Sequence, residues 1–410
     1  MSAPGDMVDH HLHGRTATAE PTEVAATAAA NRAIDILADL VGFDTTSSNS
    51  NLALMRYVEG LLARLNIPVD LVLDDSGEKA NLFASIGPAR PNGVILSGHT
   101  DVVPVAEQHW SSDPFTLVPR DGKLYGRGSA DMKSFIACSL AALEFADLGA
   151  LERPVHLAFS YDEEIGCLGA PRLIDRIRST IALPAVAIVG EPSTMRIMGS
   201  HKSVHIYRVS IAGVPAHSSA AHLGVSANAI AIRLMNVLLQ IAGSLMAEPM
   251  RNAAFEPPFS TLTVGLMKGG TAANILAAEA SFVFDLRCLP EYDPDEILAP
   301  FTAELDAIRR DHPAASATFE PLASVPGLIR EQDGAAERLV RHVGGDNADM
   351  TAGSFGAEAG QFQQAGFSTV ICGPGSIDQA HQADEFIEIG EIEKCMDFMA
   401  RLFAVLRRPS

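Results

Sequence analysis

The chain contains little cysteine, with five residues of this type in 410. Their number is odd, they are widely spaced, and no Cys-x-x-C pair occurs. A disulfide framework or a zinc site built from thiolates is therefore not expected, and a reducing compartment is favoured. We interpret the five thiols as partly buried, small apolar side chains.

Positive charge and long apolar runs are also scarce. The chain has 30 Lys and Arg residues against 50 Asp and Glu residues, a formal net charge of −20. Nucleic acid and anionic membranes would repel such a chain, so neither is expected as a partner. The first thirty residues lack the apolar stretch of a signal peptide, and polar residues interrupt the most apolar helical segment, residues 229–246. We therefore expect a cytoplasmic protein.

The length and the hydrophobic content of 47% favour two domains over a single core. Residues 1–29 are polar and alanine-rich, and we interpret them as a flexible leader. Residues 30–197 alternate apolar strands with helices, which indicates an α/β domain with a mixed, largely parallel sheet and helices on both faces. Residues 325–410 return to this pattern, so we assign both segments to one catalytic domain.

The intervening residues 198–324 have a different pattern. Their predicted order is strand, helix, strand, strand, helix, strand, which is the order of a ferredoxin-like α+β unit. Because α/β sequence flanks this unit on both sides, we expect it to be inserted into the catalytic domain as a lid.

Polar residues follow the predicted core strands of the catalytic domain. His99 and Asp101 come after one strand, Glu163 and Glu164 after the next, and Glu191 after a third. Open α/β sheets build their binding crevice at such strand ends. Each residue alone is a weak signal, since a Glu-Glu pair is most often a solvated surface. Together they predict a site on one rim of the sheet.

Two imidazoles and three carboxylates on this rim would form a metal site without thiolates. The candidate ligands are His99, Asp131, Glu164, Glu191 and His381. Nitrogen and oxygen donors suit zinc, cobalt or manganese, and two such ions need a bridging carboxylate, for which Asp131 is the candidate. Asp101 can accept the second imidazole N–H of His99. Glu163 points away from Glu164 on an extended backbone and can face a bound water.

Nine short motifs with this content run in order through the chain. They are GHTDVVP (98–104), WSSDPF (110–115), LYGRGSADMK (124–133), DEEIGCLGA (162–170), GEPS (190–193), AHSS (216–219), GGTAANI (269–275), DLRCLP (285–290) and GPGSIDQAHQADEF (373–386). Over residues 35–405 the chain resembles the metallopeptidase family that contains acetylornithine deacetylase, succinyl-diaminopimelate desuccinylase, aminoacylase and carboxypeptidase G. Within it, GEPS and GPGSIDQAH are most similar to the acetylornithine deacetylase branch.

The resemblance implies two divalent ions, with zinc expected and cobalt or manganese as alternatives. His99 and Glu191 would bind one ion, Glu164 and His381 the other, and Asp131 would bridge them. Glu163 would be the general base of amide hydrolysis. The family also predicts a cis peptide bond between Asp131 and Met132.

The resemblance also gives roles to three residues of the inserted domain. His217 would reach into the active site of a neighbouring subunit and stabilise the oxyanion, which implies a homodimer joined through this domain. Asn274 and Arg287 would contact the substrate, with Arg287 on its α-carboxylate. A salt bridge at a strand end is an equal alternative for Arg287, and a surface position is the alternative for His217.

Three interpretations of the activity remain open. The first is hydrolysis of N2-acetyl-L-ornithine in arginine biosynthesis. The second is a desuccinylase or a broader N-acyl-amino-acid hydrolase or carboxypeptidase. The third is a catalytically inactive paralogue that binds an amino-acid derivative, against which the intact ligand set and Glu163 argue. The departures from the family pattern at Ser134, Ser203 and Ala357 remove neither a ligand nor the base.

Overall fold

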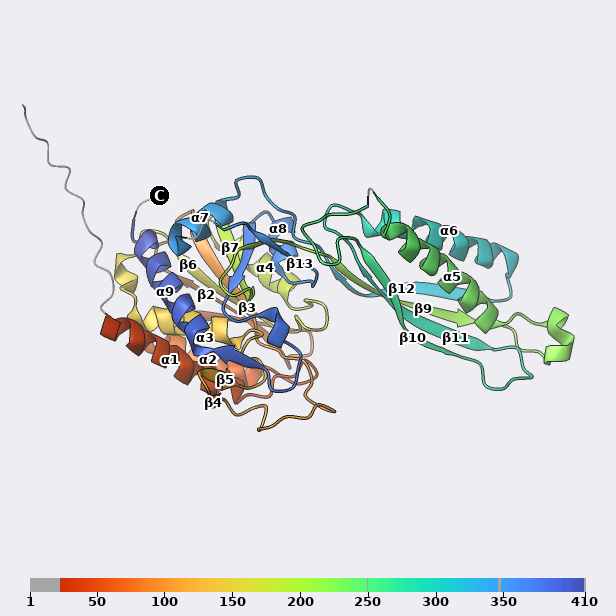
Figure 1. Ribbon diagram of the computed structural model, residues 1–410, viewed down its shortest axis with the longest axis horizontal. Helices are drawn as coiled ribbons and strands as arrows, with labels where there is room; N and C mark the ends of the chain where they lie inside the picture. The colour runs from red at the N-terminus through yellow and green to blue at the C-terminus, as the bar shows by residue number, and fades with distance from the viewer. Residues whose placement is uncertain (1–22, 249, 346–347, 409–410) are drawn as a thin grey trace, which may run out of the picture.

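The computed structural model describes residues 23–248, 250–345 and 348–408 and has two lobes. Figure 1 shows a large lobe and a narrower lobe that projects from it. Residues 1–22 of the expected leader lie outside the described residues. The end of that expected leader, residues 23–29, instead begins helix α1 (Glu23–Val41), whose inner face is buried from Ala29 onward.

An eight-stranded sheet forms the centre of the large lobe, in the order β1-β2-β6-β3-β7-β14-β8-β13. Its four central strands are parallel to one another, and the pairs β1–β2, β2–β6 and β14–β8 are antiparallel. The sheet is therefore mixed and largely parallel at its centre, as the sequence predicts. The strands are β1 (Val69–Leu73), β2 (Ala80–Ile86), β3 (Gly93–His99), β6 (Val155–Ser160), β7 (Ala185–Pro192), β8 (Met198–His201), β13 (Thr351–Gly353) and β14 (Ser368–Gly373).

Helices cover both faces of this sheet. The larger core cluster packs α1, α2, α3, α7 and α9 on one face, and a second cluster packs α4 and α8 on the other. All seven residues of β3 are buried, as expected for a central strand between two helix layers. The helices are α2 (Leu52–Arg64), α3 (Lys133–Phe145), α4 (Ala170–Thr180), α7 (Ala335–Gly344), α8 (Ala359–Gln364) and α9 (Ile389–Leu406).

A small third sheet lies at the edge of the large lobe, in the order β15-β5-β4. It joins β4 (Val118–Arg120) and β5 (Lys123–Tyr125) to β15 (Phe386–Glu388), which come from opposite ends of the chain. This pairing brings the loop between β5 and α3 beside the loop that precedes β15, and both loops carry candidate ligands.

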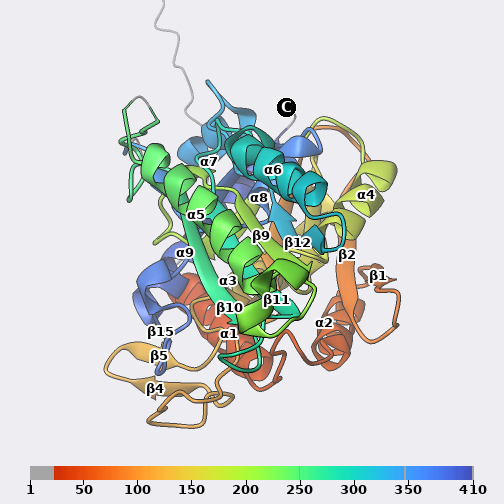
Figure 2. The same ribbon diagram turned by 90° about the vertical axis from the view of Figure 1, so that its right-hand side faces the viewer.

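The narrow lobe is a four-stranded antiparallel sheet, in the order β10-β11-β9-β12, with two helices on one face. The chain order is β9, α5, β10, β11, α6, β12, which is the predicted ferredoxin-like order; Figure 2 shows α5 and α6 lying over the strands. Burial alternates along β11, because one face packs on the helices and the other is open. The elements are β9 (Val204–Ala212), α5 (Ala227–Leu245), β10 (Thr261–Gly269), β11 (Glu279–Arg287), α6 (Pro294–Asp311) and β12 (Ser316–Val325).

The boundary between the large and the narrow lobe differs from the domain boundary expected at residue 198. Strand β8, which begins at Met198, pairs with β13 and β14 in the large sheet. The four-stranded sheet of the narrow lobe begins only at Val204. The two residues Lys202 and Ser203 connect the sheets on this side. The short sequence Met-Gly-Ser-His at 198–201 gives no signal of which sheet it joins.

Helix α5 is the one described helix that is long and apolar enough, by length and composition alone, to cross a membrane. One face of it packs into the core of the narrow lobe through Ile230, Leu234, Leu238 and Ile241. A third of the apolar window is buried there, and core helices pass the same test. The finding is weak evidence for a membrane span.

Candidate active site

The predicted ligands meet at one rim of the large sheet, where its parallel strands end. His99 is the last residue of β3, and Glu191 lies at the end of the neighbouring β7. Glu164 follows β6, and Asp131 lies two residues before α3 begins. His381 follows the short helix η3 (Ile377–Gln379), far away in the sequence. The peptide bond between Asp131 and Met132 is cis, as the resemblance to the family predicts.

The five side chains form two groups that share Asp131. In one, His99 Nε2 lies 3.0 Å from Asp131 Oδ1 and 3.7 Å from Glu191 Oε1. In the other, His381 Nε2 lies 3.3 Å from Asp131 Oδ2 and 3.0 Å from Glu164 Oε2. Each oxygen of Asp131 therefore faces a different imidazole, which is the arrangement that a carboxylate bridging two ions requires.

The charges of this rim strongly perturb one another. Burial opposes ionisation of Asp131, but hydrogen bonds from His381 and His99 outweigh it and lower the pKa of this carboxyl. Hydrogen bonds to Asp131 and Glu164 raise the pKa of His381 to about 10. Burial, together with the charge of Asp131, raises the pKa of Glu164 to about 7 and that of Glu191 well above its ordinary value.

The donor set fits divalent metal ions. In each group the candidate ligand atoms lie within 4.8 Å of one another. Glu191 Oε1 is buried and has no hydrogen-bond partner among the described residues, which is costly for a carboxylate unless a cation binds it. Imidazole nitrogens and carboxylate oxygens are ligands for zinc, cobalt and manganese. The rim can therefore hold two such ions with Asp131 between them.

Asp101 contacts different groups from those expected. The Nδ1 atom of His99 lies 2.9 Å from the backbone carbonyl oxygen of Asp101, whereas the nearest oxygen of the Asp101 carboxylate is 3.7 Å away. That carboxylate instead accepts the backbone N–H groups of Glu163 and Glu164 at 3.0 and 3.2 Å, and the hydroxyl of Ser47 at 2.7 Å. Asp101 thus fixes His99 through its backbone and the Glu-Glu turn through its side chain.

Glu163 and Glu164 point in different directions. Glu164 contacts His381, while Glu163 Oε1 accepts a hydrogen bond from the buried thiol of Cys167 at 3.2 Å. Burial, with the charges of Glu164 and Asp131 adding to it, raises the pKa of Glu163 to about 8. A carboxylate with a raised pKa can accept and return a proton near neutral pH, which a general base of hydrolysis must do.

Several supporting residues carry little signal in the sequence. Glu358 is buried beneath the rim and accepts the hydroxyls of Ser97 and Ser160 at 2.6 and 2.8 Å. Lys79 pairs with Asp162, just before the Glu-Glu turn, at 2.5 Å. Long-range pairs of this kind cannot be read from a single chain. The GAEAG stretch around Glu358 is the one local hint, since a glutamate among small residues is unusual in a core.

The structure does not bring the candidate residues of the narrow lobe to this rim. His217 is exposed and directly precedes η2 (Ser218–Leu223), the bright green turn at the far end of the narrow lobe in Figure 1. Asn274 lies beside it, where its carbonyl oxygen accepts the N–H of Ser218 at 2.9 Å. Arg287, at the end of β11, pairs with Asp285 at 3.2 Å, the salt-bridge alternative for this residue.

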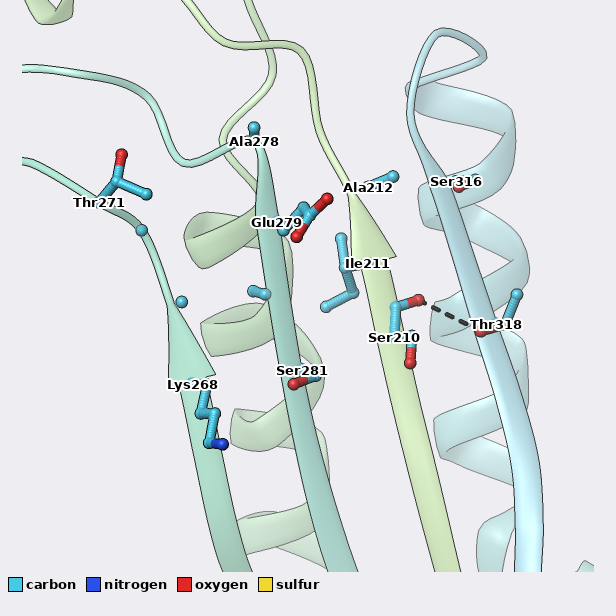
Figure 3. Close-up of a pocket in the computed structure, with 13 residues that line it drawn as sticks. Ser210, Ile211, Ala212, Lys268, Thr271, Ala278, Glu279, Ser281, Ser316 and Thr318 are labelled. Carbon is cyan, nitrogen blue, oxygen red and sulfur yellow. Dashed lines mark hydrogen bonds between the residues drawn. The ribbon is translucent and has the colours of Figure 1, made fainter.

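A recess of about 650 Å³ lies away from the rim, on the open face of the four-stranded sheet of the narrow lobe. Figure 3 shows Lys268, Glu279, Ser281 and Thr318 along it, with Thr318 donating to the backbone of Ser210. Its lining is hydroxyls, small side chains and one charge of each sign. It holds no constellation of nucleophile and base, so the chemistry of the chain belongs to the rim of the large sheet.

The fold and the rim together define a metal-dependent hydrolase with an inserted second domain. The model of peptidase family M20/M25/M40 matches residues 95–404, and the chain belongs to this family. The acetylornithine deacetylase of Myxococcus xanthus is 32% identical over 373 residues, covering 90% of this chain and 96% of that protein. That of Proteus mirabilis is 33% identical over 366 residues, covering 88% and 91%.

A solved structure shows the same fold. Aminopeptidase PepT from Bacillus cereus superposes with a TM-score of 0.71 over 92% of this chain and 99% of its own. At 19% identity this likeness concerns the fold alone. The resemblance noted from the nine motifs is thus confirmed at the level of the family, and the chain is an enzyme that acts on small molecules.

Proposed function

We propose that the enzyme hydrolyses N2-acetyl-L-ornithine to L-ornithine and acetate, a reaction of arginine biosynthesis in the cytoplasm. The observation that carries the reaction type is the pair of ligand groups sharing Asp131, with Glu163 free of both imidazoles. The substrate rests on the two deacetylases that match nearly the whole chain. The acidic net charge agrees with a cationic amino-acid product.

His99, Glu191 and Asp131 would hold one ion and Asp131, Glu164 and His381 the other, with zinc as the expected metal and cobalt or manganese as alternatives. Bound divalent ions supply Lewis-acid polarisation of the amide and lower the pKa of a water. Glu163 takes the proton of the attacking water and delivers it to the departing amine, which leaves acetate and the free amino acid. The carboxylate of Asp101 holds Glu163 in place by accepting the backbone N–H of Glu163.

His217 would complete the site from a second subunit. Within one chain His217 is exposed and directly precedes η2, so it would reach a rim only if a partner supplies it. There an N–H group can stabilise the oxyanion of the tetrahedral intermediate. Asn274 beside it would contact the substrate in the same way. Arg287 would bind the α-carboxylate by exchanging its present partner, Asp285.

The narrow lobe offers a surface for this homodimer. Ile232 and Leu239 on α5 and Met246 directly after it recur every seven residues and are 63%, 67% and 51% exposed. Strand β10 beside α5 is a sheet edge, and its Leu266 and Met267 are exposed. An open strand edge next to an apolar helix stripe is a ready surface for pairing with a second copy.

The experiment is amine release from N-acetyl-L-ornithine, N-succinyl-diaminopimelate and N-acetyl-L-methionine, with added zinc or cobalt and with a chelator. We expect chelator-sensitive turnover that is selective for acetylornithine. Turnover that favours another substrate would keep the mechanism and replace the substrate by that of a desuccinylase or a broader acylase. Two bound metals without turnover on any of the three would favour an inactive binding paralogue or a substrate outside the panel.

A further inference from the structure

A buried arginine lies behind the second ligand group. The side chain of Arg127 is 1% exposed and follows β5 on the loop that leads to Asp131. Its Nη1 donates to Glu385 at 2.7 Å, and its Nη2 donates to the side-chain oxygen of Gln108 at 2.7 Å. The ring of Trp110 lies 5.0 Å from the guanidinium. One side chain thus joins three loops.

Glu385 connects this arginine to the bridging carboxylate. Its Oε1 accepts the backbone N–H groups of Ala130 and Asp131 at 2.8 and 3.0 Å, and its Oε2 also accepts that of Gly128 at 3.1 Å. The carboxylate therefore has three backbone donors besides Arg127. This set of contacts fixes the backbone from which the Asp131 side chain projects.

Gln108 connects the same arginine to His381. Its Nε2 donates to the carbonyl oxygen of His381 at 2.9 Å, and its Oε1 also accepts the indole N–H of Trp110 at 3.2 Å. His381 has a φ of 63°, a left-handed conformation that is uncommon for a residue with a side chain. Its side chain is 55% exposed, so packing does little to fix the imidazole.

His99, in contrast, is fixed without this network. It is the last residue of the buried strand β3, it is 1% exposed, and its Nδ1 lies 2.9 Å from the backbone carbonyl of Asp101. The two imidazoles that face Asp131 are therefore supported differently. The first is supported by the sheet, and the second is supported by a side chain, Gln108, that Arg127 holds.

We propose that Arg127, Glu385 and Gln108 are positioning residues that set the distance between Asp131 and His381 and thereby the affinity of the second metal site. This inference rests on the proposed two-metal function. It assigns the three residues no contact with the substrate. Groups that orient metal ligands typically change metal affinity by about 10–100-fold when they are replaced.

The test is titration of the metal-free, full-length protein with Co²⁺, followed by calorimetry and by the visible absorption of bound cobalt. The main variants are Gln108→Glu and Gln108→Ala. Gln108→Glu keeps an acceptor for Arg127 and removes the donor to His381, while Gln108→Ala removes both. Gln108 is half-buried, and Arg127 keeps its bond to Glu385 in both variants, so neither change leaves this buried charge without a partner.

We expect wild-type protein to bind two Co²⁺ ions. Both Gln108 variants should bind the first within about threefold of wild type and the second about 10–100-fold more weakly. Glu385→Gln and Arg127→Lys should show a larger loss at the second site, because a carboxamide or an ammonium cannot make both sets of contacts. In the Gln108 variants at saturating Co²⁺, kcat should recover while KM for substrate stays unchanged.

The matched control is Glu144→Gln. Glu144 accepts both hydrogen bonds of Arg32 at 2.8 Å on α3, away from the rim, and its replacement should leave both affinities unchanged. Equal weakening of both sites in the Gln108 variants, or wild-type binding in all folded variants, would overturn the proposal while leaving the two-metal function intact. Fewer than two ions bound by wild type would instead overturn the two-metal function itself.

Discussion

The polar residues of the two lobes differ in their burial and in their contacts. At the rim of the large sheet the charged side chains are mostly buried and contact one another, and nearby groups such as Glu358 and Asp101 have their partners within the chain. At the tip of the narrow lobe, His217 and Asn274 are exposed and contact only their neighbours. Under the proposed function, one chain would assemble the metal-binding half of a site, and the substrate-binding half would be completed by movement or by a partner.

The substitution Glu163→Gln is the sharpest test of the metal-binding half of the site. A carboxamide has nearly the shape of the carboxylate but cannot accept the proton of the attacking water, so turnover should fall by about 10²–10⁴-fold. The substrate assay with acetylornithine measures this loss. Metal content should remain that of wild type, because Glu163 faces Cys167 and neither imidazole. A near-wild-type rate would remove Glu163 as the base, and loss of metal would make it a ligand.

The substitution His217→Ala tests the substrate-binding half of the site. We expect turnover to fall by about 10²–10³-fold, the usual effect of removing one oxyanion donor. The measurement that distinguishes a partner's histidine from the chain's own is complementation. When His217→Ala and Glu163→Gln chains are unfolded and refolded together, about half of the dimers are mixed, and each has one site with both residues intact.

About a quarter of the wild-type rate should then return. The two variants refolded separately and mixed at the end are the control and should stay inactive. No recovery in the refolded mixture would assign His217 to its own chain's site or to no site, and the comparison of the lobes would then reflect closure of the narrow lobe instead of dimerisation.

The sequence predicts the metal ligands far better than the residues that hold these ligands in place. His99 and Glu191 lie at the ends of apolar strands and Glu164 lies shortly after one, so their place on one rim follows from the pattern of a parallel sheet. The contacts of Glu385 and Glu358 join residues that lie 198 to 261 positions apart in the chain, and no local pattern encodes them. Asp101 shows the limit within a motif, because its position was predictable and its backbone, not its carboxylate, contacts His99.

The surface of the narrow lobe can be tested with the double substitution Ile232→Glu and Leu239→Glu. Both residues are exposed on α5, so the fold should be kept, whereas burying four charges in a symmetric interface should weaken dimerisation by at least about 30-fold. Light scattering coupled to gel filtration should show a monomer with turnover near that of His217→Ala. Leu73→Glu, a 48% exposed position on β1, is the control and should stay dimeric. A dimer of the double variant would move the interface elsewhere.

The smallest expected effect concerns a buried histidine of the large lobe that supports no ligand. His156 on β6 is 2% exposed, both ring nitrogens lack partners among the described residues, and burial lowers its pKa to about 4. The unfolded chain, with an ordinary pKa near 6.5, takes up a proton first, so folded stability is full above about pH 6.5 and falls as the pH drops toward 4. At pH 5 this linkage costs about 2 kcal/mol.

His156→Leu removes that linkage with a side chain of similar volume. Denaturant unfolding should therefore show a stability gain over wild type that grows by about 2 kcal/mol between pH 7.5 and pH 5, with turnover at pH 7.5 unchanged. His201, whose pKa burial also lowers to about 4, stays in both proteins, so part of the acid sensitivity should remain. A gain that is independent of pH would mean that His156 stays neutral in the unfolded chain as well or is charged in the folded one.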